Sequence, residues 1–207
     1  MKSFNTTDSF LEDLENEILH TNQQLLNSKR EKDGFLCSVN FMKIAFSKNL
    51  LDDIRFLYKS SEQSLFKARH ADVILRGMLE QVIEFIYLLK HTELIKDYMG
   101  LNVDITKLTT CNPVEGMHKL GCKRFSGGRK SVSEMAQNIG EKRSSQNDTP
   151  LYGLYQILSE QCHNSYFFTN LDDVKEVETG QKPLTLTKEQ ALYIVIIVER
   201  FMETYRQ

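Results

Sequence analysis

The sequence is poor in residues that interrupt or cross-link a chain. Its 207 residues include no Trp, only 3 Pro and 10 Gly, and 4 Cys. So little Pro and Gly excludes a collagen-like chain, and a hydrophobic fraction of 41% excludes a low-complexity disordered one. A chain of this length can bury a sizeable core as one unit. We therefore expect a single globular domain over residues 1–207.

The sequence also lacks the features of an exported or membrane-spanning protein. The longest apolar run, Ala191 to Val198, has eight residues, whereas a bilayer requires about 20. The first residues contain no apolar segment of the kind found in signal peptides. The cysteines are scattered without a CxxC pair, which is typical of reduced thiols. We expect a cytoplasmic protein with no membrane partner.

A strong net charge is missing as well. The chain carries 26 Lys and Arg against 28 Asp and Glu, a net charge of -2. Such a chain has no overall field that attracts nucleic acid. Any binding of RNA or of a nucleotide therefore needs a local patch.

What the first 100 residues do contain is long helical patterns without Pro. We expect an amphipathic helix within residues 1–30 that starts at a Ser9/Glu12 capping box, and a second helix from Phe35 to Tyr58, broken near Ser47. A third helix starts at Ser60 and reaches as far as Tyr98. Its segment Val73–Leu89 has 12 apolar residues in 17, which predicts a buried central helix.

The second half predicts shorter helices joined by loops. Residues 100–130 lack helical periodicity and are expected to be mostly loop. Ser131 with Glu134 forms a capping box for a short helix that Gly140 ends, and Thr149-Pro150 opens a helix to about Cys162. The last element contains a β-rich run, but a Thr187/Gln190 capping box favours a helix. The predicted fold is an all-α bundle of about five to six helices.

A polar stripe crosses the predicted central helix. Arg76, Glu80 and Tyr87 share one face, and Arg76 and Glu80 are four residues apart and can form an ion pair. One interpretation is an internal ion pair that fixes the register of the helix. The other is an Arg–Glu couple in a cleft, in which Arg76 binds an anion.

A second candidate group lies on the helix after Pro150. Tyr152, Ser159 and His163 fall together beside its apolar face, and Ser159 is four residues from His163. A hydroxyl and an imidazole at this spacing can transfer a proton. The alternative is a histidine that satisfies a buried carbonyl near the end of the helix. The sequence disfavours a serine hydrolase, because Ser159 is expected inside a helix instead of on a strained elbow and no Gly-x-Ser-x-Gly motif is present.

Two sequence spacings suggest a metal site, but neither is expected to bring its side chains to one metal ion. Glu17-x-x-His20 and Glu160-x-x-His163 repeat the spacing of di-iron bundles, but the helical wheel directs the four side chains apart. The spacing of Cys111, His118 and Cys122 is irregular for zinc. We predict no metal ion and no cofactor.

The loop 116–131 is locally basic, with five Lys or Arg and no acidic residue. It lacks the glycines that a phosphate loop requires. It is either a solvated loop or a contact for RNA or nucleotide phosphates. The candidate contact residues are Lys123, Arg124, Arg129 and Lys130.

Three segments resemble a bacterial all-helical family of unknown function. They are Arg76-Gly-Met-Leu-Glu80, Phe125 to Ala136 and Leu158-Ser159-Glu-Gln-Cys-His163-Asn-Ser165. The family's pattern is Arg-x-x-x-Glu on a buried helix and Ser-x-x-x-His before the final helix. The resemblance covers about residues 60–170, and the family is related to the HEPN-like bundles.

Several HEPN-like bundles are ribonucleases of toxin and phage-defence systems. The resemblance implies an RNA-directed nuclease or a nucleotide-processing protein in which Arg76 binds phosphate, Glu80 orients it and His163 is acid or base with support from Ser159. Those nucleases carry Arg four to six residues before the histidine, and no Arg stands there before His163. The alternative is a non-catalytic interaction bundle of a defence or regulatory system. The amphipathic N-terminal helix makes a homodimer a further expectation.

Overall fold

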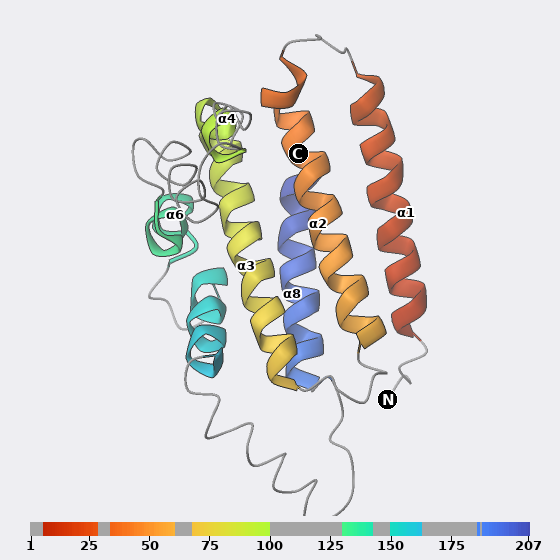
Figure 1. The fold of residues 1–207 in the computed structure, drawn as a ribbon, viewed down its shortest axis with the longest axis vertical. Helices are drawn as coiled ribbons and strands as arrows, with labels where there is room; N and C mark the ends of the chain where they lie inside the picture. The colour runs from red at the N-terminus through yellow and green to blue at the C-terminus, as the bar shows by residue number, and fades with distance from the viewer. Residues whose placement is uncertain are drawn as a thin grey trace, which may run out of the picture.

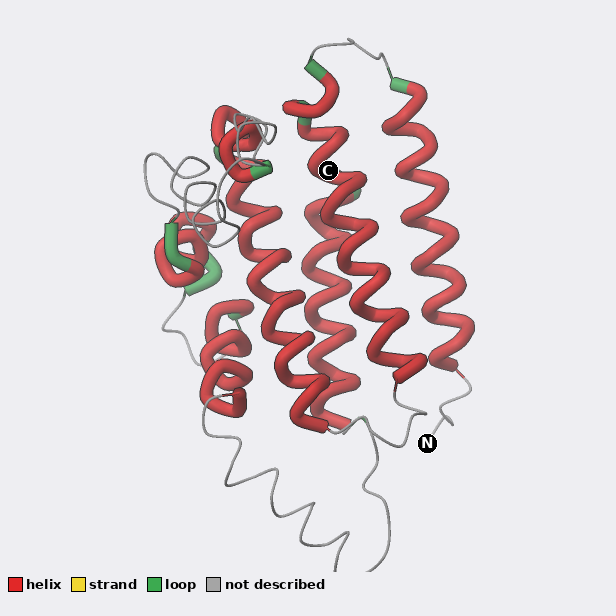
Figure 2. Tube along the Cα trace, in the orientation of Figure 1, coloured by secondary structure: helices red, strands yellow, loops and turns green. Residues whose placement is uncertain are grey.

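The computed structural model describes residues 6–28, 34–60, 68–99, 130–142, 150–162, 186 and 188–207. The α-helices within these residues are α1 (Thr6–Asn27), α2 (Val39–Ser60), α3 (Ala68–Lys90), α4 (Ile95–Tyr98), α6 (Val132–Ile139), a helix over residues 151–162 and α8 (Lys188–Tyr205). Two 3-10 turns, η1 (Phe35–Cys37) and η2 (Thr92–Leu94), precede α2 and α4. No strand occurs in the described part of the chain (Figure 2). The predicted all-α class is confirmed, with one helix more than the highest expected number.

The long helices form one bundle around α3. In Figure 1, α1, α2 and α3 stand side by side, α8 is seen behind α2 and α3, and α6 and helix 151–162 stand on the other side of α3. The residue contacts agree, since α3 packs against α2, α6 and α8, and α1 packs against α2. None of the described helices has the length and apolar character needed to cross a bilayer.

The buried character of α3 is confirmed. Eight of its apolar side chains have at most 1% exposure: Ala71, Leu75, Met78, Leu79, Val82, Ile83, Phe85 and Leu88. The Phe85 ring lies 5.5 Å from the ring of Phe46 on α2 and 4.7 Å from the ring of Phe201 on α8. Aromatic pairs at these distances add to the energy of apolar burial. Phe85 therefore joins three helices at the centre of the bundle.

Local capping signals place α6 as the sequence predicts. The Glu134 amide donates to Ser131 Oγ, and the Ser131 amide donates to the Glu134 carboxylate at 2.8 Å. Gly140 follows the helix with a φ of 82°, a left-handed conformation that glycine adopts without strain. The next residue, Glu141, accepts from the Leu151 amide at 3.2 Å and pairs with Arg200. This carboxylate joins the start of helix 151–162 to α8.

Three expectations for the first half are wrong. Helix α2 is continuous at Ser47, because the Ser47 hydroxyl is buried and bonded to Ile44 O and to Asn22 on α1. The hydroxyl is therefore satisfied by its own helix and by α1 without a break in α2. The structure also places Ser9 inside α1, and Ser60 at the end of α2 instead of before α3.

The third helix is shorter than expected at its far end. α3 ends at Lys90, and the turn η2 and the short helix α4 follow. His91 marks the break, with φ -130° and ψ 61° outside the helical region. The expected loop over residues 100–130 lies almost entirely outside the described residues. The last element is a helix, α8, as the capping box predicts.

Candidate functional site

Arg76 is the centre of the candidate site. Its Nη2 lies 3.4 Å from Glu80 Oε1 and donates to the Tyr155 hydroxyl at 3.3 Å. Its guanidinium carbon lies 5.4 Å from the centre of the Tyr155 ring, and Cys162 also hydrogen bonds to it. Arg76 therefore bridges α3 and helix 151–162. Its side chain keeps 29% exposure, so solvent still reaches it.

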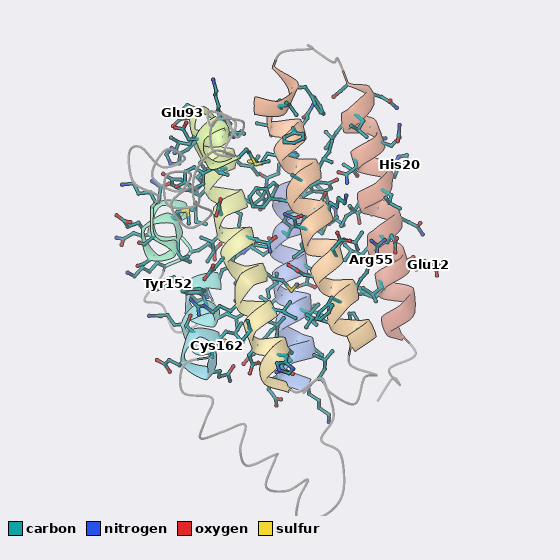
Figure 3. All side chains as sticks on the ribbon, in the orientation of Figure 1. Glu12, His20, Arg55, Glu93, Tyr152 and Cys162 are labelled. Atoms are coloured by element: carbon teal, nitrogen blue, oxygen red, sulfur yellow. The ribbon has the colours of Figure 1, made fainter. Side chains whose placement is uncertain are left out.

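The residues that face Arg76 share one side of helix 151–162. Tyr155, Ser159 and Cys162 are spaced i, i+4 and i+7, which places them on one helical face. Arg76 contacts the first and the last of the three, so Ser159 lies between two residues that Arg76 touches. Figure 3 shows Tyr152 and Cys162 at opposite ends of this short helix.

Two polar atoms at this junction are buried without a hydrogen-bond partner in the described structure. They are Arg76 Nε and Ser159 Oγ. Buried polar groups in native proteins are nearly always paired with protein, water or a ligand. Both groups can donate a hydrogen bond, so an acceptor such as an anionic oxygen would satisfy them.

Asp72 lies one helical turn before Arg76 on α3. It is 7% exposed, and its Oδ1 accepts a 2.6 Å hydrogen bond from Gln190 Nε2 on α8. Burial raises the pKa of Asp72, and the hydrogen bond from Gln190 opposes this shift. Desolvation and the nearby Asp72 charge also raise the pKa of the Cys162 thiol, although Arg76 acts in the opposite direction. The Cys162 thiol is therefore protonated at neutral pH and is a poor nucleophile.

The expected polar stripe is present only in part. The pair Arg76–Glu80 forms as the spacing predicts. Tyr87 belongs to a different cluster, because its ring lies 4.5 Å from the ring of His91 and 6.2 Å from that of Tyr98. The stripe therefore divides into a site around Arg76 and an aromatic cluster at the C-terminal end of α3.

Several predicted site residues lie outside the described residues. These are His163, Lys123, Arg124 and Arg129. The fourth basic residue, Lys130, is exposed, and its amide donates to the Tyr98 hydroxyl at 3.3 Å. In the sequence, His163 directly follows Cys162, the last described residue of its helix.

Four residues of the site were not predicted from the sequence: Asp72, Tyr155, Cys162 and Gln190. The spacing of Asp72, Arg76 and Glu80, each four residues apart, is a signal that could have identified Asp72. Helical periodicity places Tyr155 and Cys162 with Leu151 and Leu158 on the apolar face of their helix, so the local pattern gives no sign that they meet a charged group. Their contacts with Arg76 depend on how that helix packs on α3.

Among the described residues, no group of three or more His, Cys, Asp or Glu side chains is placed to hold a metal ion. Glu17, one residue of the di-iron spacing, makes two hydrogen bonds with Arg206 at 2.6 and 2.8 Å. The hydrogen bond from Arg206 lowers the pKa of Glu17. His20 instead bonds to Gln24 on its own helix.

No protein-family model matches this sequence, and neither a curated protein nor a solved structure matches it. The site around Arg76 is therefore the basis for assigning a function.

Proposed function

We propose that this protein is a HEPN-like, RNA-directed nuclease with Arg76, Glu80, Ser159 and His163 in its site. The observation that carries the proposal is the pair of buried donors, Arg76 Nε and Ser159 Oγ, without a partner in the described structure. A phosphate oxygen is a strong acceptor for both groups, and charge-assisted bonds from Arg are among the strongest in proteins. A phosphodiester at this junction would satisfy donors that are otherwise costly to bury.

Each described residue has a role in the proposed reaction. The hydrogen bond with Tyr155 raises the pKa of Arg76, so its positive charge is retained at all physiological pH values. Glu80 and Tyr155 hold the guanidinium plane in place. Arg76 then stabilises the negative charge that grows on the phosphate oxygens during cleavage. Ser159 donates to the same phosphate group.

His163 supplies the proton transfer in this proposal, since it follows Cys162 in the sequence and Cys162 bonds to Arg76. His163 takes the proton of the RNA 2′-hydroxyl, and the 2′-oxygen attacks phosphorus. The bond from phosphorus to the 5′-oxygen breaks, and that oxygen takes a proton from water. The products are a 2′,3′-cyclic phosphate and a free 5′-hydroxyl.

The test is cleavage of total RNA and of a defined single strand by the purified protein, with and without EDTA. We expect cleavage that is indifferent to EDTA and is lost in His163→Ala and Arg76→Ala. His20→Ala is the matched control, because His20 is exposed on α1 on the far side of the bundle from Cys162 (Figure 3). Equal cleavage by wild type and His163→Ala, or a requirement for a metal ion, would contradict the proposal.

A second candidate is a non-catalytic interaction bundle in a defence or regulatory system. The contacts of Arg76 with Glu80 and Tyr155 favour it, because they are also what a structural network needs. In that case Arg76→Ala and His163→Ala each lower the stability by about 1–3 kcal/mol, since each removes a side chain of the structural network. No RNA cleavage accompanies the loss. If the residues are catalytic, the melting temperature changes little while cleavage disappears.

We also propose that the protein is a homodimer and that it is located in the cytoplasm. α1 packs on α2 but leaves Leu19 54% exposed. A second copy that covers this face of α1 is the proposed dimer. Sedimentation equilibrium of wild type and Leu19→Glu tests it, and a monomeric wild type contradicts it.

A further inference from the structure

Two cations and two tyrosines form a continuous row beside the candidate site. The rings of Tyr152 and Tyr155 stack with centres 5.9 Å apart and an angle of 27° between their planes. Lys142 Nζ lies 5.2 Å from the centre of the Tyr152 ring, and the Arg76 guanidinium lies 5.4 Å from that of Tyr155. We call Lys142, Tyr152, Tyr155 and Arg76 the cation–tyrosine row.

The row is assembled from three segments of the chain. Lys142 follows α6, the tyrosines belong to helix 151–162, and Arg76 belongs to α3. The helix that carries the tyrosines is anchored by Leu151, Leu154 and Leu158, each at most 1% exposed. Tyr155 borders this leucine face and Tyr152 lies further around the helix, so both tyrosines are held at the margin of the packed face.

One end of the row reaches the surface. Tyr152 and Tyr155 are partly buried and pack against the hydrophobic core, whereas Lys142 is exposed. The Tyr152 ring is therefore bordered by an exposed lysine side chain. Stacked aromatic rings with a positive charge at each end are suited to a ligand with flat rings and negative groups.

The carboxylates near the row leave room for an anionic ligand, because each of them already has a partner. Glu141 is already used by the Leu151 amide and by Arg200. Glu80 pairs with Arg76 and is the carboxylate that opposes an anion at that end. At the other end, Lys142 bonds to the neutral Ser133 hydroxyl at 2.8 Å.

We propose that the cation–tyrosine row binds single-stranded RNA. An unpaired base takes the place of the exposed Lys142 side chain on the Tyr152 ring, and Lys142 and Arg76 contact the flanking phosphates. A duplex does not fit this chemistry, because its bases are already stacked on one another and inaccessible. The inference rests on the proposed function for the role of Arg76, and it adds the substrate class, an unpaired strand.

The test is fluorescence anisotropy with a labelled single-stranded oligouridine of about 12 nucleotides. The probe carries 2′-O-methyl groups, which remove the 2′-hydroxyl nucleophile and prevent cleavage. Its blunt duplex with 2′-O-methyl oligoadenosine is the second probe. The full-length wild type is compared with Tyr152→Leu, Tyr152→Phe, Lys142→Ala and Lys48→Ala, and the melting temperature of each variant shows that it is folded.

The row makes a separate prediction for each variant. Tyr152→Leu keeps an apolar side chain but loses the ring, and weakens binding of the single strand by about 5- to 150-fold. Tyr152→Phe keeps the ring and binds within about 2-fold of wild type. Lys142→Ala weakens binding and lowers the slope of log affinity against log salt by about one. Lys48→Ala, an exposed lysine on α2, leaves both quantities unchanged.

Glu80→Gln gives a result of the opposite sign. It removes the carboxylate that competes with phosphate for Arg76, so binding of the single strand becomes tighter. Weaker binding in this variant would contradict the placement of a phosphate at Arg76.

Failure of the inference is distinguishable from failure of the proposed function. If wild type cleaves RNA but Tyr152→Leu binds the single strand normally, or the duplex binds equally well, the row is not the binding surface. If binding depends on Tyr152 but wild type cleaves nothing, the surface is supported and the nuclease is not. If wild type binds neither probe at about 100 μM protein in low salt, both are wrong.

Discussion

Gln190 and Asp72 lie 118 positions apart in the sequence, and Gln190 Nε2 donates to Asp72 Oδ1 at 2.6 Å. Both side chains are buried, with 4% and 7% exposure. The bond connects the first turn of α8 to α3 one turn before Arg76. The position of Arg76 relative to the rest of the bundle therefore depends on the packing of the last helix against α3.

Asp72→Asn should make the protein more stable at neutral pH. Burial raises the pKa of Asp72 above its ordinary value of 3.8, so the folded state holds this proton more tightly than the unfolded state. The stability that Asp72 contributes is fully present below about pH 3.8 and is lost as the pH rises through the folded-state pKa. The asparagine side chain of the variant is neutral at every pH, and its carbonyl oxygen can still accept from Gln190. We expect the melting temperature of the variant to exceed that of wild type at pH 7.

The melting temperatures of Asp72→Asn and wild type are measured by calorimetry at pH 7 and at pH 4. The difference between the two proteins should be smaller at pH 4. Each kcal/mol corresponds to about 2–4 °C in a domain of this size. Asp52→Asn is the control, because Asp52 is 56% exposed on α2. A variant that melts below wild type at pH 7 would show that the Asp72 charge is needed in the folded state.

Arg76→Lys should abolish cleavage and leave the fold intact. Lysine keeps the charge but has no planar fork to donate to Tyr155 and to a phosphate together. We expect the cleavage rate to fall by about 100-fold or more and the melting temperature to fall by less than about 3 °C. Arg55→Lys is the matched variant, since Arg55 is also an ion-paired arginine on a helix surface, with Glu15 and Asp52 as its partners. If Arg76→Lys and Arg55→Lys cleave RNA equally fast, Arg76 is not a residue of the catalytic site.

Gly77→Ala should stabilise the protein. Gly77 lies inside α3, where glycine costs about 1 kcal/mol relative to alanine. A Cβ at this position meets nothing within 4 Å. The expected gain is about 0.5–1 kcal/mol, read as a higher melting temperature. Gly140→Ala is the contrasting variant, because its φ of 82° strains any residue with a Cβ; a gain there as well would mean that α6 does not end as described.

Ser131→Ala should destabilise the protein by about 1 kcal/mol, because it removes the cap of α6. Chemical denaturation of wild type, Ser131→Ala and Gln137→Ala measures it. Gln137 is exposed on the same helix, so its replacement should be nearly neutral. An unchanged Ser131→Ala variant would indicate that α6 contributes little to the global stability.

Local sequence was a good guide at several sites where one helical turn contains the whole interaction, although the capping boxes at Ser9 and Ser60 failed. The capping box at Ser131, the glycine cap at Gly140 and the pair Arg76–Glu80 all join residues at most four positions apart. The Thr187/Gln190 pattern also predicted the correct secondary structure for α8, despite its β-rich run, although the Gln190 side chain donates to Asp72 on α3. These features need no knowledge of the rest of the fold.

Local sequence failed where a distant partner changes the outcome. Serine inside a helix suggested a break at Ser47, but Asn22 on α1 accepts from and donates to its hydroxyl, and α2 continues. The end of α3 at Lys90 also has a distant contributor. His91, next in the chain, bonds to Asn138, and Lys90 bonds to Ile139 O.

The amino-acid sequence by itself determined the all-α class, the buried α3 and the ion pair on its surface. Helical periodicity and capping act over a few residues, so they can be read directly from the chain. Only the tertiary structure decided that Tyr155 and Cys162 meet Arg76, that Asp72 is buried against Gln190, and that Lys142 lies over Tyr152. These contacts join segments separated by loops, and their geometry follows from how the helices pack, which no local pattern encodes.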